Sequence, residues 1–344
     1  MSKNIDRRTW LSLAAGTALV LGLAAPAIAE NPTKLNIAVI LSAGIENSWD
    51  GTMIRSLERV KAEKPHGLEL SWKYTDPLWG DEAGDAMRLF AESGDYDIIW
   101  AHSTYSDQVK KLKDEFPEIL FVVVGSGNEP LGGNQYWVYK RTHEPAYLMG
   151  LLAGRLTKSN KIGAIGTYPA DDVNDSINAF FAGAKSVNPE VKQTAVFIES
   201  WYDPAKAGEY LNAQVSTGVD MVYQLAGNFE PCVQHKIMCF GNFDDQNSYA
   251  PDNIVSSTVA VWDADIKRIT DAWWQHKTEG TPYAGDTAIK YLTLAEGGSA
   301  LAPYHNLDAK LPKEVKDEVE ATEAKIISGE LVVPLLVETP VTDQ

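Results

Sequence analysis

Aromatic side chains stand just after most of the hydrophobic runs that the sequence predicts to be strands. A single ring in such a loop is explained by capping of a core. Rings after so many strands indicate a shared cleft, because the carboxyl ends of parallel strands meet along one edge of a sheet. Flat rings stack on a planar ligand or on the apolar face of a sugar, and neighbouring polar groups fix its edge. We therefore predict a ligand-binding cleft built from these residues: Asn47, Trp49, Ser103, Tyr105, Asp107, Asp172, Trp201, Phe229, Phe243, Asp244 and Trp262.

Motifs for catalysis are absent from the sequence. It has no G-x-S-x-G elbow, no phosphate-binding Walker loop, no G-x-G-x-x-G after the first predicted strand and no H-E-x-x-H. His102 follows a strand, but a structural role explains it better. The loop Gly125–Asn128 fits either anion binding through backbone N–H groups or ordinary turn chemistry. Asp244 and Asp245 are the best acid and base of a hydrolase, yet vicinal carboxylates in a loop usually point apart.

The only two cysteines, Cys232 and Cys239, belong to one short stretch. In an oxidising compartment they are expected to form a disulfide, with two free buried thiols as the alternative. His235 lies between them, but a fourth ligand for a metal ion is not evident, so we predict no metal site.

The N-terminus is typical of an export signal. A cationic start with Arg7 and Arg8 precedes an apolar run over 11–25, and Ala27-Ile28-Ala29 is a small-x-small cleavage site. We predict a signal peptide over residues 1–29. The arginine pair also resembles a twin-arginine signal, so the export route stays open. Because no cysteine lies near the cleavage site, we expect no lipid anchor and a periplasmic location.

The charge of the chain excludes several classes of partner. The formal net charge is −17, and removal of residues 1–29, with three cations and one anion, makes it −19. Nucleic acid and anionic membrane surfaces would repel such a body, so we expect neither nucleic-acid binding nor direct membrane insertion. About 315 residues remain after cleavage, enough for two domains.

Short β-branched runs alternate with amphipathic helical patterns after residue 34, which is typical of parallel sheets covered by helices. The predicted strands are Asn36–Leu41, Glu69–Tyr74, Tyr96–Ala101, Leu120–Val124, Lys161–Gly166, Val191–Ile198, Met221–Ala226, Met238–Gly241, Ile254–Val259, Tyr283–Leu294 and Leu331–Val337. The later predicted helices are Ala146–Gly154, Val173–Val187, Pro204–Thr217, Asp263–Glu279 and Lys313–Ser328; Asp81–Glu92 and Tyr105–Glu115 are two of the earlier ones. Trp79, Trp100 and Trp137 are predicted to be packing residues.

Two consecutive doubly wound sets followed by segments that cross back predict an α/β chain with two similar lobes. We expect a two-lobed periplasmic-binding-protein type I fold, each lobe a doubly wound parallel sheet, with the cleft between the lobes. The N-terminal lobe is predicted over 34–141 plus about 261–298, and the C-terminal lobe over 142–260 plus about 299–340.

Four segments resemble motifs of the basic membrane protein family, whose best-understood members look like purine nucleoside receptors of ABC importers. Glu46–Asp50 is similar to the family's Asp-x-Ser-Phe-Asn, and Glu144–Gly150 matches Glu-x-Ala-Tyr-Leu-x-Gly. Gly218–Val222 matches a Gly-x-Asp-hydrophobic segment, and Gly241–Gln246 is similar to Gly-Val-Asp-Ser-Asp-Gln. The resemblance covers nearly the whole mature chain and rests on the order and spacing of these pieces.

The departures from the family bear on the ligand. The family's aromatic that stacks on the base corresponds to Trp49. The Asp expected to hold the ribose hydroxyls corresponds to Phe243, and Ala260 or Val261 stands where the family has a Lys. The expected glycine-rich loop reads Gly227–Cys232. The loss of two polar sugar contacts indicates a ligand without a ribose, or one bound differently.

Together these observations predict an exported substrate-binding protein of an ABC importer. It is expected to bind a small planar or ring-containing solute, to act as a monomer without cofactor or turnover, and to meet a membrane permease. Trp49 with Phe229 or Phe243 would stack, and Asn47, Ser103 and Asp107 would hydrogen-bond. The opposite wall would hold Asp172, Asp244 and Trp262. The alternatives are a sensor subunit for a membrane receptor and, less favoured, a secreted hydrolase.

Overall fold

Parallel strands form two separate sheets in the structure, a computed structural model that describes residues 31–343. The first sheet has the order β2-β1-β3-β4-β5, and every neighbouring pair is parallel. Its strands are β1 (Lys34–Ile40), β2 (Glu69–Tyr74), β3 (Ile98–Ala101), β4 (Leu120–Val124) and β5 (Gln135–Val138). The predicted signal peptide, residues 1–29, lies outside the described residues.

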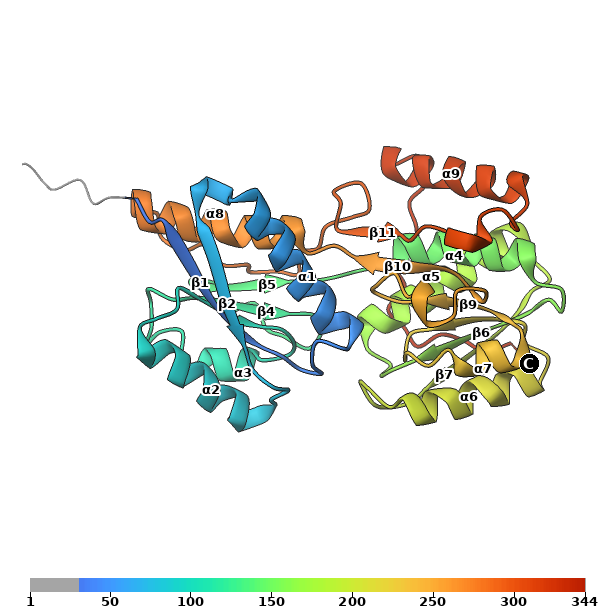
Figure 1. Ribbon diagram of the computed structural model, residues 1–344, viewed down its shortest axis with the longest axis horizontal. Coiled ribbons are helices and arrows are strands. Elements are labelled where there is room, and N and C mark those ends of the chain that lie inside the picture. Colours follow the sequence, from blue (N-terminus) through green and yellow to red (C-terminus); the bar gives the residue numbers. More distant parts are fainter. Residues whose placement is uncertain (1–30, 344) are drawn as a thin grey trace, which may run out of the picture. The chain divides into compact units, whose positions relative to one another are not determined.

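Helices cover both faces of the first sheet (Figure 1). On one face, Leu35 and Ile37 of β1 pack with Leu57 and with Trp273. On the other face, the alternate residue Ala38 packs with side chains of the next two helices. This alternation follows from the period of two along a strand. The helices are α1 (Ser48–Glu63) and α8 (Asp263–Glu279) on the first face, and α2 (Gly80–Ser93) and α3 (Ser106–Lys110) on the second.

The second sheet has the order β11-β10-β9-β8-β6-β7, parallel except for the antiparallel pair β10 and β11. Its strands are β6 (Lys161–Gly166), β7 (Lys192–Phe197), β8 (Met221–Gln224), β9 (Met238–Gly241), β10 (Ile254–Ala260) and β11 (Ser299–Leu301). One face packs on α4 (His143–Leu156), α5 (Asp171–Val187) and α9 (Lys313–Ser328). The other face packs on α6 (Pro204–Ser216) and α7 (Glu230–His235). Short 3-10 turns are Pro65–Gly67, Asn247–Tyr249 and His305–Leu307.

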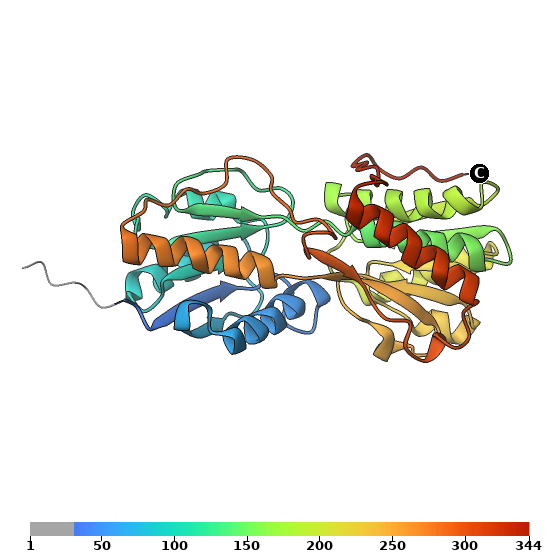
Figure 2. The ribbon, with the colours of Figure 1, turned by 90° about the horizontal axis from the view of Figure 1, so that it is seen from above.

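We call each sheet with its helices a lobe; both belong to one structural unit that begins at Pro32. The described chain passes from the first lobe to the second after β5, returns after β10 to form α8, and passes again before β11 (Figure 2). The residue bounds predicted for the lobes stay a prediction. No helix in residues 31–343 has both the length and the apolar character needed to cross a bilayer.

Two predicted strands are wrong. The segment Tyr283–Leu294 makes one isolated bridge, Tyr139 with Tyr291, and is otherwise irregular. A side-chain hydrogen bond takes the place of backbone pairing between strands there, because the Asp286 carboxylate accepts the backbone N–H of Trp137 at 2.9 Å. The segment 331–337 is also irregular; its carbonyls at 336 and 337 accept from side-chain amides of α5 instead of from a strand. The strands β5 and β11 were not predicted.

Helices α4 and α5 pack with their backbones in contact at two glycines. A Cβ on Gly150 would lie 1.9 Å from the carbonyl oxygen of Phe180, and one on Gly183 would lie 2.0 Å from that of Tyr147. Only hydrogen fits at such a distance. The small residues of the predicted helix Ala146–Gly154 therefore serve this contact.

We predict that Gly150→Ala lowers the free energy of unfolding by about 3 kcal/mol, because the helices must separate to admit one methyl group. Urea denaturation of the two proteins measures this change. Gly84→Ala is the matched control, since Gly84 lies in α2 and its Cβ would meet only the flexible side chain of Gln108, at 3.3 Å. The control should be neutral or stabilising, because alanine favours a helix over glycine. Equal stability of Gly150→Ala and the parent would contradict the close packing.

Candidate functional site

A cavity of about 200 Å³ lies where the carboxyl ends of the strands of both lobes face each other. Its wall is built from the loops that follow β1, β2, β3 and β4 in the first lobe and β6, β7, β8 and β9 in the second. This is the place that the parallel-sheet rule indicates for a ligand. Of the predicted site residues, the cavity is lined by Asn47, Trp49, Ser103, Asp172, Trp201 and Phe243.

Trp49 lies at the start of α1 and is held from several sides. Its backbone N–H donates to the Asn47 side chain, which caps the helix, at 2.9 Å. Its indole N–H donates to the His102 carbonyl at 3.0 Å. Its ring lies against Gly125, where a Cβ would approach ring atoms to 3.2 Å. A rigid, half-buried ring is thus presented to the cavity by the first lobe.

Phe243 reaches the same place from the second lobe. Its ring meets that of Trp49 edge-on, with centroids 5.1 Å apart and planes at 69°. Its φ of 62° is rare for a residue with a side chain. The backbone is held there because the Phe243 N–H donates to Thr258 at 3.1 Å and its carbonyl accepts from Ala260 at 2.9 Å. Such strain is characteristic of functional loops.

A buried carboxylate fixes the loop that carries Trp49. Asp50 accepts backbone N–H bonds from Ser42, Ala43 and Gly44 at 3.1, 2.6 and 2.8 Å. Burial raises the pKa of Asp50 to about 6, although these backbone bonds act in the opposite direction. The loop after β1 and the first turn of α1 therefore form one rigid unit.

His102 has the structural role expected of it. Its ring accepts from Trp100 Nε1 at 2.9 Å, and its Nε2 lies 3.1 Å from the Trp49 carbonyl. Burial lowers the pKa of His102 to about 3, so the imidazole is neutral. The loop Gly125–Asn128 is a turn pinned by Asn128, whose amide donates to the carbonyls of residues 103, 124 and 125.

Two predicted site residues of the first lobe do not reach the cavity. Tyr105 is 1% exposed; its hydroxyl donates to the Leu78 carbonyl at 2.7 Å, and its ring supports Trp79 at 5.4 Å. Asp107 is exposed on α3 and does not line the cavity. Each follows a strand, but the first turn of its helix directs it elsewhere.

Three further predicted residues also lie outside the cavity wall. Phe229 is buried and stacks parallel to Tyr249 beside a second hollow, with centroids 6.2 Å apart. Asp244 is paired with Arg55 of the first lobe at 2.5 Å. Trp262 is fully buried beneath Trp49, with ring centroids 5.2 Å apart. These positions give them packing and ion-pairing roles, and the proposal below does not include them as ligand contacts.

The cavity wall also contains residues outside the predicted set of ligand contacts. Trp79 was predicted to be a packing residue, but it lines the cavity and is 41% exposed, with its indole N–H donating to the Ser42 carbonyl at 2.9 Å. Tyr202 and Ser126 also line the wall. The signal for Trp79 was present, since it is an aromatic residue a few positions after β2. Trp100 and Trp137 are buried, as predicted.

One hydrogen bond near the cavity joins the lobes directly. The Gln246 amide of the second lobe donates to the Ser48 hydroxyl of α1 at 2.9 Å, and both residues line the cavity. The same Gln246 accepts from the Asn242 N–H at 2.9 Å. With the Arg55–Asp244 pair, this bond connects the two lobes beside the cavity.

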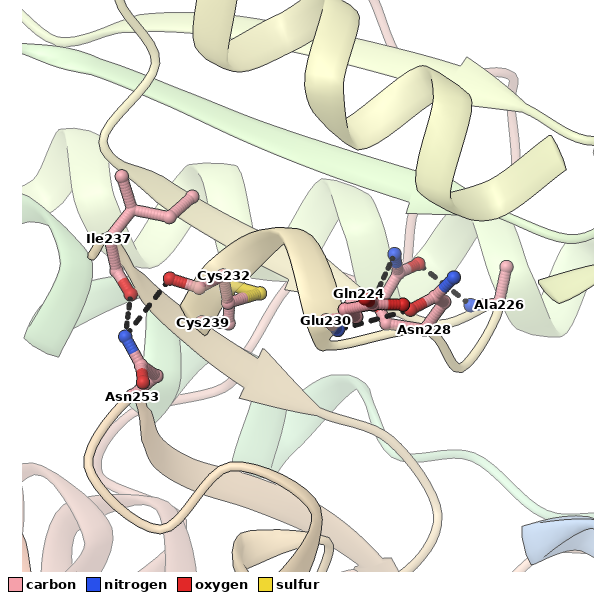
Figure 3. The surroundings of a disulfide bond; sticks show 8 residues. All are labelled: Gln224, Ala226, Asn228, Glu230, Cys232, Ile237, Cys239 and Asn253. Carbon is pink, nitrogen blue, oxygen red and sulfur yellow. Dashed lines mark hydrogen bonds between the residues drawn. A yellow bond between two sulfur atoms is a disulfide. The ribbon is translucent and has the colours of Figure 1, made fainter. Parts of the chain in front are cut away.

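A disulfide joins Cys232 of α7 to Cys239 of β9 (Figure 3). Asn253 bridges the loop between them, since its amide donates to the carbonyls of Cys232 and Ile237 at 3.0 and 2.8 Å. The link anchors α7 beneath the loop that follows β8, which contributes Gly227 to the cavity wall.

Known proteins of one family are similar to this chain over most of its described residues. The model of the family described as ABC transporter substrate-binding protein PnrA-like matches residues 34–336. A purine-binding protein of Brucella abortus is 27% identical over 73% of this chain and 69% of its own. The ABC transporter nucleoside-binding protein BmpA of Lactococcus lactis is 30% identical over 56% of this chain and 58% of its own.

The fold is shared with solved structures. A solute-binding protein of an ABC transporter system from Conexibacter woesei superposes with a TM-score of 0.68 at 20% identity, covering 87% of this chain and 98% of its own. The two-lobed α/β fold is therefore that of ABC solute-binding proteins. Because the family model spans nearly all of the described residues, this chain belongs to the PnrA-like family of ABC transporter substrate-binding proteins, which are not enzymes.

Proposed function

We propose that this protein captures a purine base or a related planar heterocycle in the cavity between its lobes and delivers it to the permease of an ABC importer. The observation that carries the proposal is the meeting of Trp49 and Phe243, one from each lobe, in the wall of a single cavity. Aromatic rings supply large contact area to a flat ligand at little entropic cost.

The polar groups of the wall favour a base over its phosphorylated forms. Among the described residues that line the cavity, no Lys, Arg or His is present, whereas Glu46 and Asp172 are acidic. A phosphate would meet no compensating charge there. Amides and hydroxyls, such as those of Asn47 and Ser103, are suited to the edge of a heterocycle.

A ribose is also poorly provided for. Phe243 occupies the position at which the resemblance placed an acidic partner for ribose hydroxyls, and its ring lies against Trp49. One relative is named a purine-binding protein and another a nucleoside-binding protein. Between a purine base and a nucleoside, the residues of this cavity wall favour the base.

Delivery implies export and closure. We propose that residues 1–29 direct the chain to the periplasm as a monomer without a lipid anchor. The three connecting segments, which join the lobes after β5, after β10 and before β11, would act as the hinge. Ligand binding would hold the lobes together around the cavity. The permease would then recognise the closed pair of lobes.

Titration calorimetry of the purified protein tests the function. Adenine, guanine and hypoxanthine, the matching nucleosides, and glucose are titrated separately after any co-purifying compound has been extracted and identified by mass spectrometry. We predict stoichiometric binding of at least one base, at least about tenfold tighter than its nucleoside, with the ligand recovered unchanged. Absence of binding to every compound would refute the proposal. Conversion of a ligand would favour an enzyme.

A further inference from the structure

A buried carboxylate forms part of the cavity wall, and one of its two oxygens has no hydrogen-bond partner among the described residues. Asp172 is the second residue of α5 and is 7% exposed. Its Oδ1 is buried, and no described residue makes a hydrogen bond to it. Buried carboxylate oxygens in folded proteins are normally hydrogen-bonded, because an unmade bond costs free energy. Asp172 also lines the cavity, so a ligand there can contact its side chain.

The carboxylate stands beside the ring proposed to stack. Gly125 is a neighbour of both: a Cβ there would lie 3.9 Å from Asp172 Oδ2 and 3.2 Å from the ring of Trp49. A planar molecule placed on the indole would thus present an edge to Asp172. Because Trp49 belongs to the first lobe and Asp172 to the second, such a ligand would bridge the lobes.

The charged groups around Asp172 leave it the dominant charge at the cavity. Asp171 precedes it on α5, and Asp175 lies one turn further on. Arg141 is the nearby cation, but it is buried and already pairs with Asp171 at 3.3 Å and with Asp175. The Tyr139 hydroxyl donates to Asp171. The other acid in the wall, Glu46, is exposed, so solvent screens it.

The carboxyl of Asp172 changes its protonation state near pH 6. Burial raises the pKa of Asp172 to about 6; Asp171 adds to the rise, while Ser126 and Arg141 oppose it. The carboxyl is therefore increasingly ionised as pH rises through about 6. Only the ionised form accepts a charge-assisted hydrogen bond from a ligand N–H.

We propose that Asp172 determines the class of ligand, so that the site takes neutral or cationic heterocycles whose ring edge carries an N–H donor and rejects anionic ones. This inference rests on the proposed function, because it needs a ring-containing ligand in this cavity. For a ligand that stays neutral, affinity should rise between about pH 5 and about pH 7.5, since the carboxylate form accumulates over that range.

The experiment compares one neutral purine with one anionic purine. The neutral probe is whichever of adenine, guanine and hypoxanthine binds the parent protein most tightly, and the anionic probe is urate at pH 7.5. Calorimetry is run on the parent, Asp172→Asn and Asp107→Asn. Asn is nearly isosteric and removes the charge, and Asp107→Asn makes the same change at an exposed position of α3 that does not line the cavity.

We expect the parent to bind the neutral purine at least tenfold more tightly than urate. In Asp172→Asn the affinity for the neutral purine should fall about tenfold, and the affinity for urate should not fall. The ratio of the two affinities therefore becomes smaller, and the affinity for the neutral purine no longer rises with pH. Asp107→Asn should keep both the preference for the neutral purine and the rise of its affinity with pH. A variant Asp172→Asn with the preference and pH profile of the parent would overturn this inference alone. A parent that binds no purine would overturn the proposed function with it.

Discussion

Replacing Trp49 with alanine is expected to weaken binding of a purine base by about 5- to 150-fold. Stacking of one base on an aromatic side chain is worth about 1–3 kcal/mol by alanine substitution, which corresponds to this range. The effect should fall at the upper end, because the indole is already oriented by its bond to the His102 carbonyl at 3.0 Å. A ligand that stacks on it therefore immobilises little of the protein. Calorimetric titration of the parent and variant measures the change.

A loss of affinity has to be separated from a loss of structure. Trp49→Phe keeps a ring but not the indole N–H, and should retain most of the affinity. Trp274→Ala is the matched control: Trp274 is half-buried on α8, where it stacks on His66 at 4.7 Å, and it does not line the cavity. It should cost stability without changing affinity. If Trp49→Ala bound the base as tightly as the parent, Trp49 would not be the stacking residue.

The positions of strands, and hence of the cavity, could be predicted because local patterns determine them. The strands β2, β4, β6 and β9 were predicted with the bounds that the structure has, and loops at their carboxyl ends line the cavity as the parallel-sheet rule requires. Trp49 and Asn47 could be placed from the same reasoning, since they begin the helix after the first strand. It was harder to predict which aromatic rings face the cavity, because their orientation depends on contacts between segments far apart in the sequence.

Trp262 and Asp244 show why. Trp262 follows a strand, as Trp49 does. Its indole N–H donates to the Thr52 hydroxyl of α1 at 2.9 Å, and its ring is buried in the core. Asp244 forms an ion pair with Arg55, which lies 189 residues earlier in the chain. No local pattern contains either partner. Asp172 was predicted for the opposite wall and does line the cavity, but its closeness to Trp49 depends on contacts between the lobes that no local pattern contains.

Replacing Lys140 with methionine is expected to lower the free energy of unfolding by about 3–5 kcal/mol. Lys140 lies in the first connecting segment and its side chain is 0% exposed. Its ammonium donates to the carbonyl of Val261 at 2.5 Å and to that of Gly298 at 3.4 Å, which belong to the other two connecting segments. It also pairs with the buried carboxylate of Asp265. Burial lowers the pKa of Lys140, and Asp265 opposes that shift.

One side chain therefore ties together all three segments that join the lobes. Methionine fills a similar volume, so the expected loss comes from Asp265 left buried without its cation and from the Val261 carbonyl left without its donor. Asp265→Asn added to Lys140→Met should recover part of the loss, which distinguishes an uncompensated charge from a packing defect. Chemical denaturation of the four proteins gives the coupling.

Lys310→Met is the matched control, since Lys310 pairs with Asp252 at 2.9 Å while both side chains are largely exposed. It should change the free energy of unfolding by less than about 1 kcal/mol. If Lys140→Met were equally mild, the three segments would be held by their backbone contacts alone. The bond from the Val261 N–H to the Gly298 carbonyl at 3.1 Å would then suffice to align the hinge. A large loss instead means that one buried charge holds the three connecting segments together.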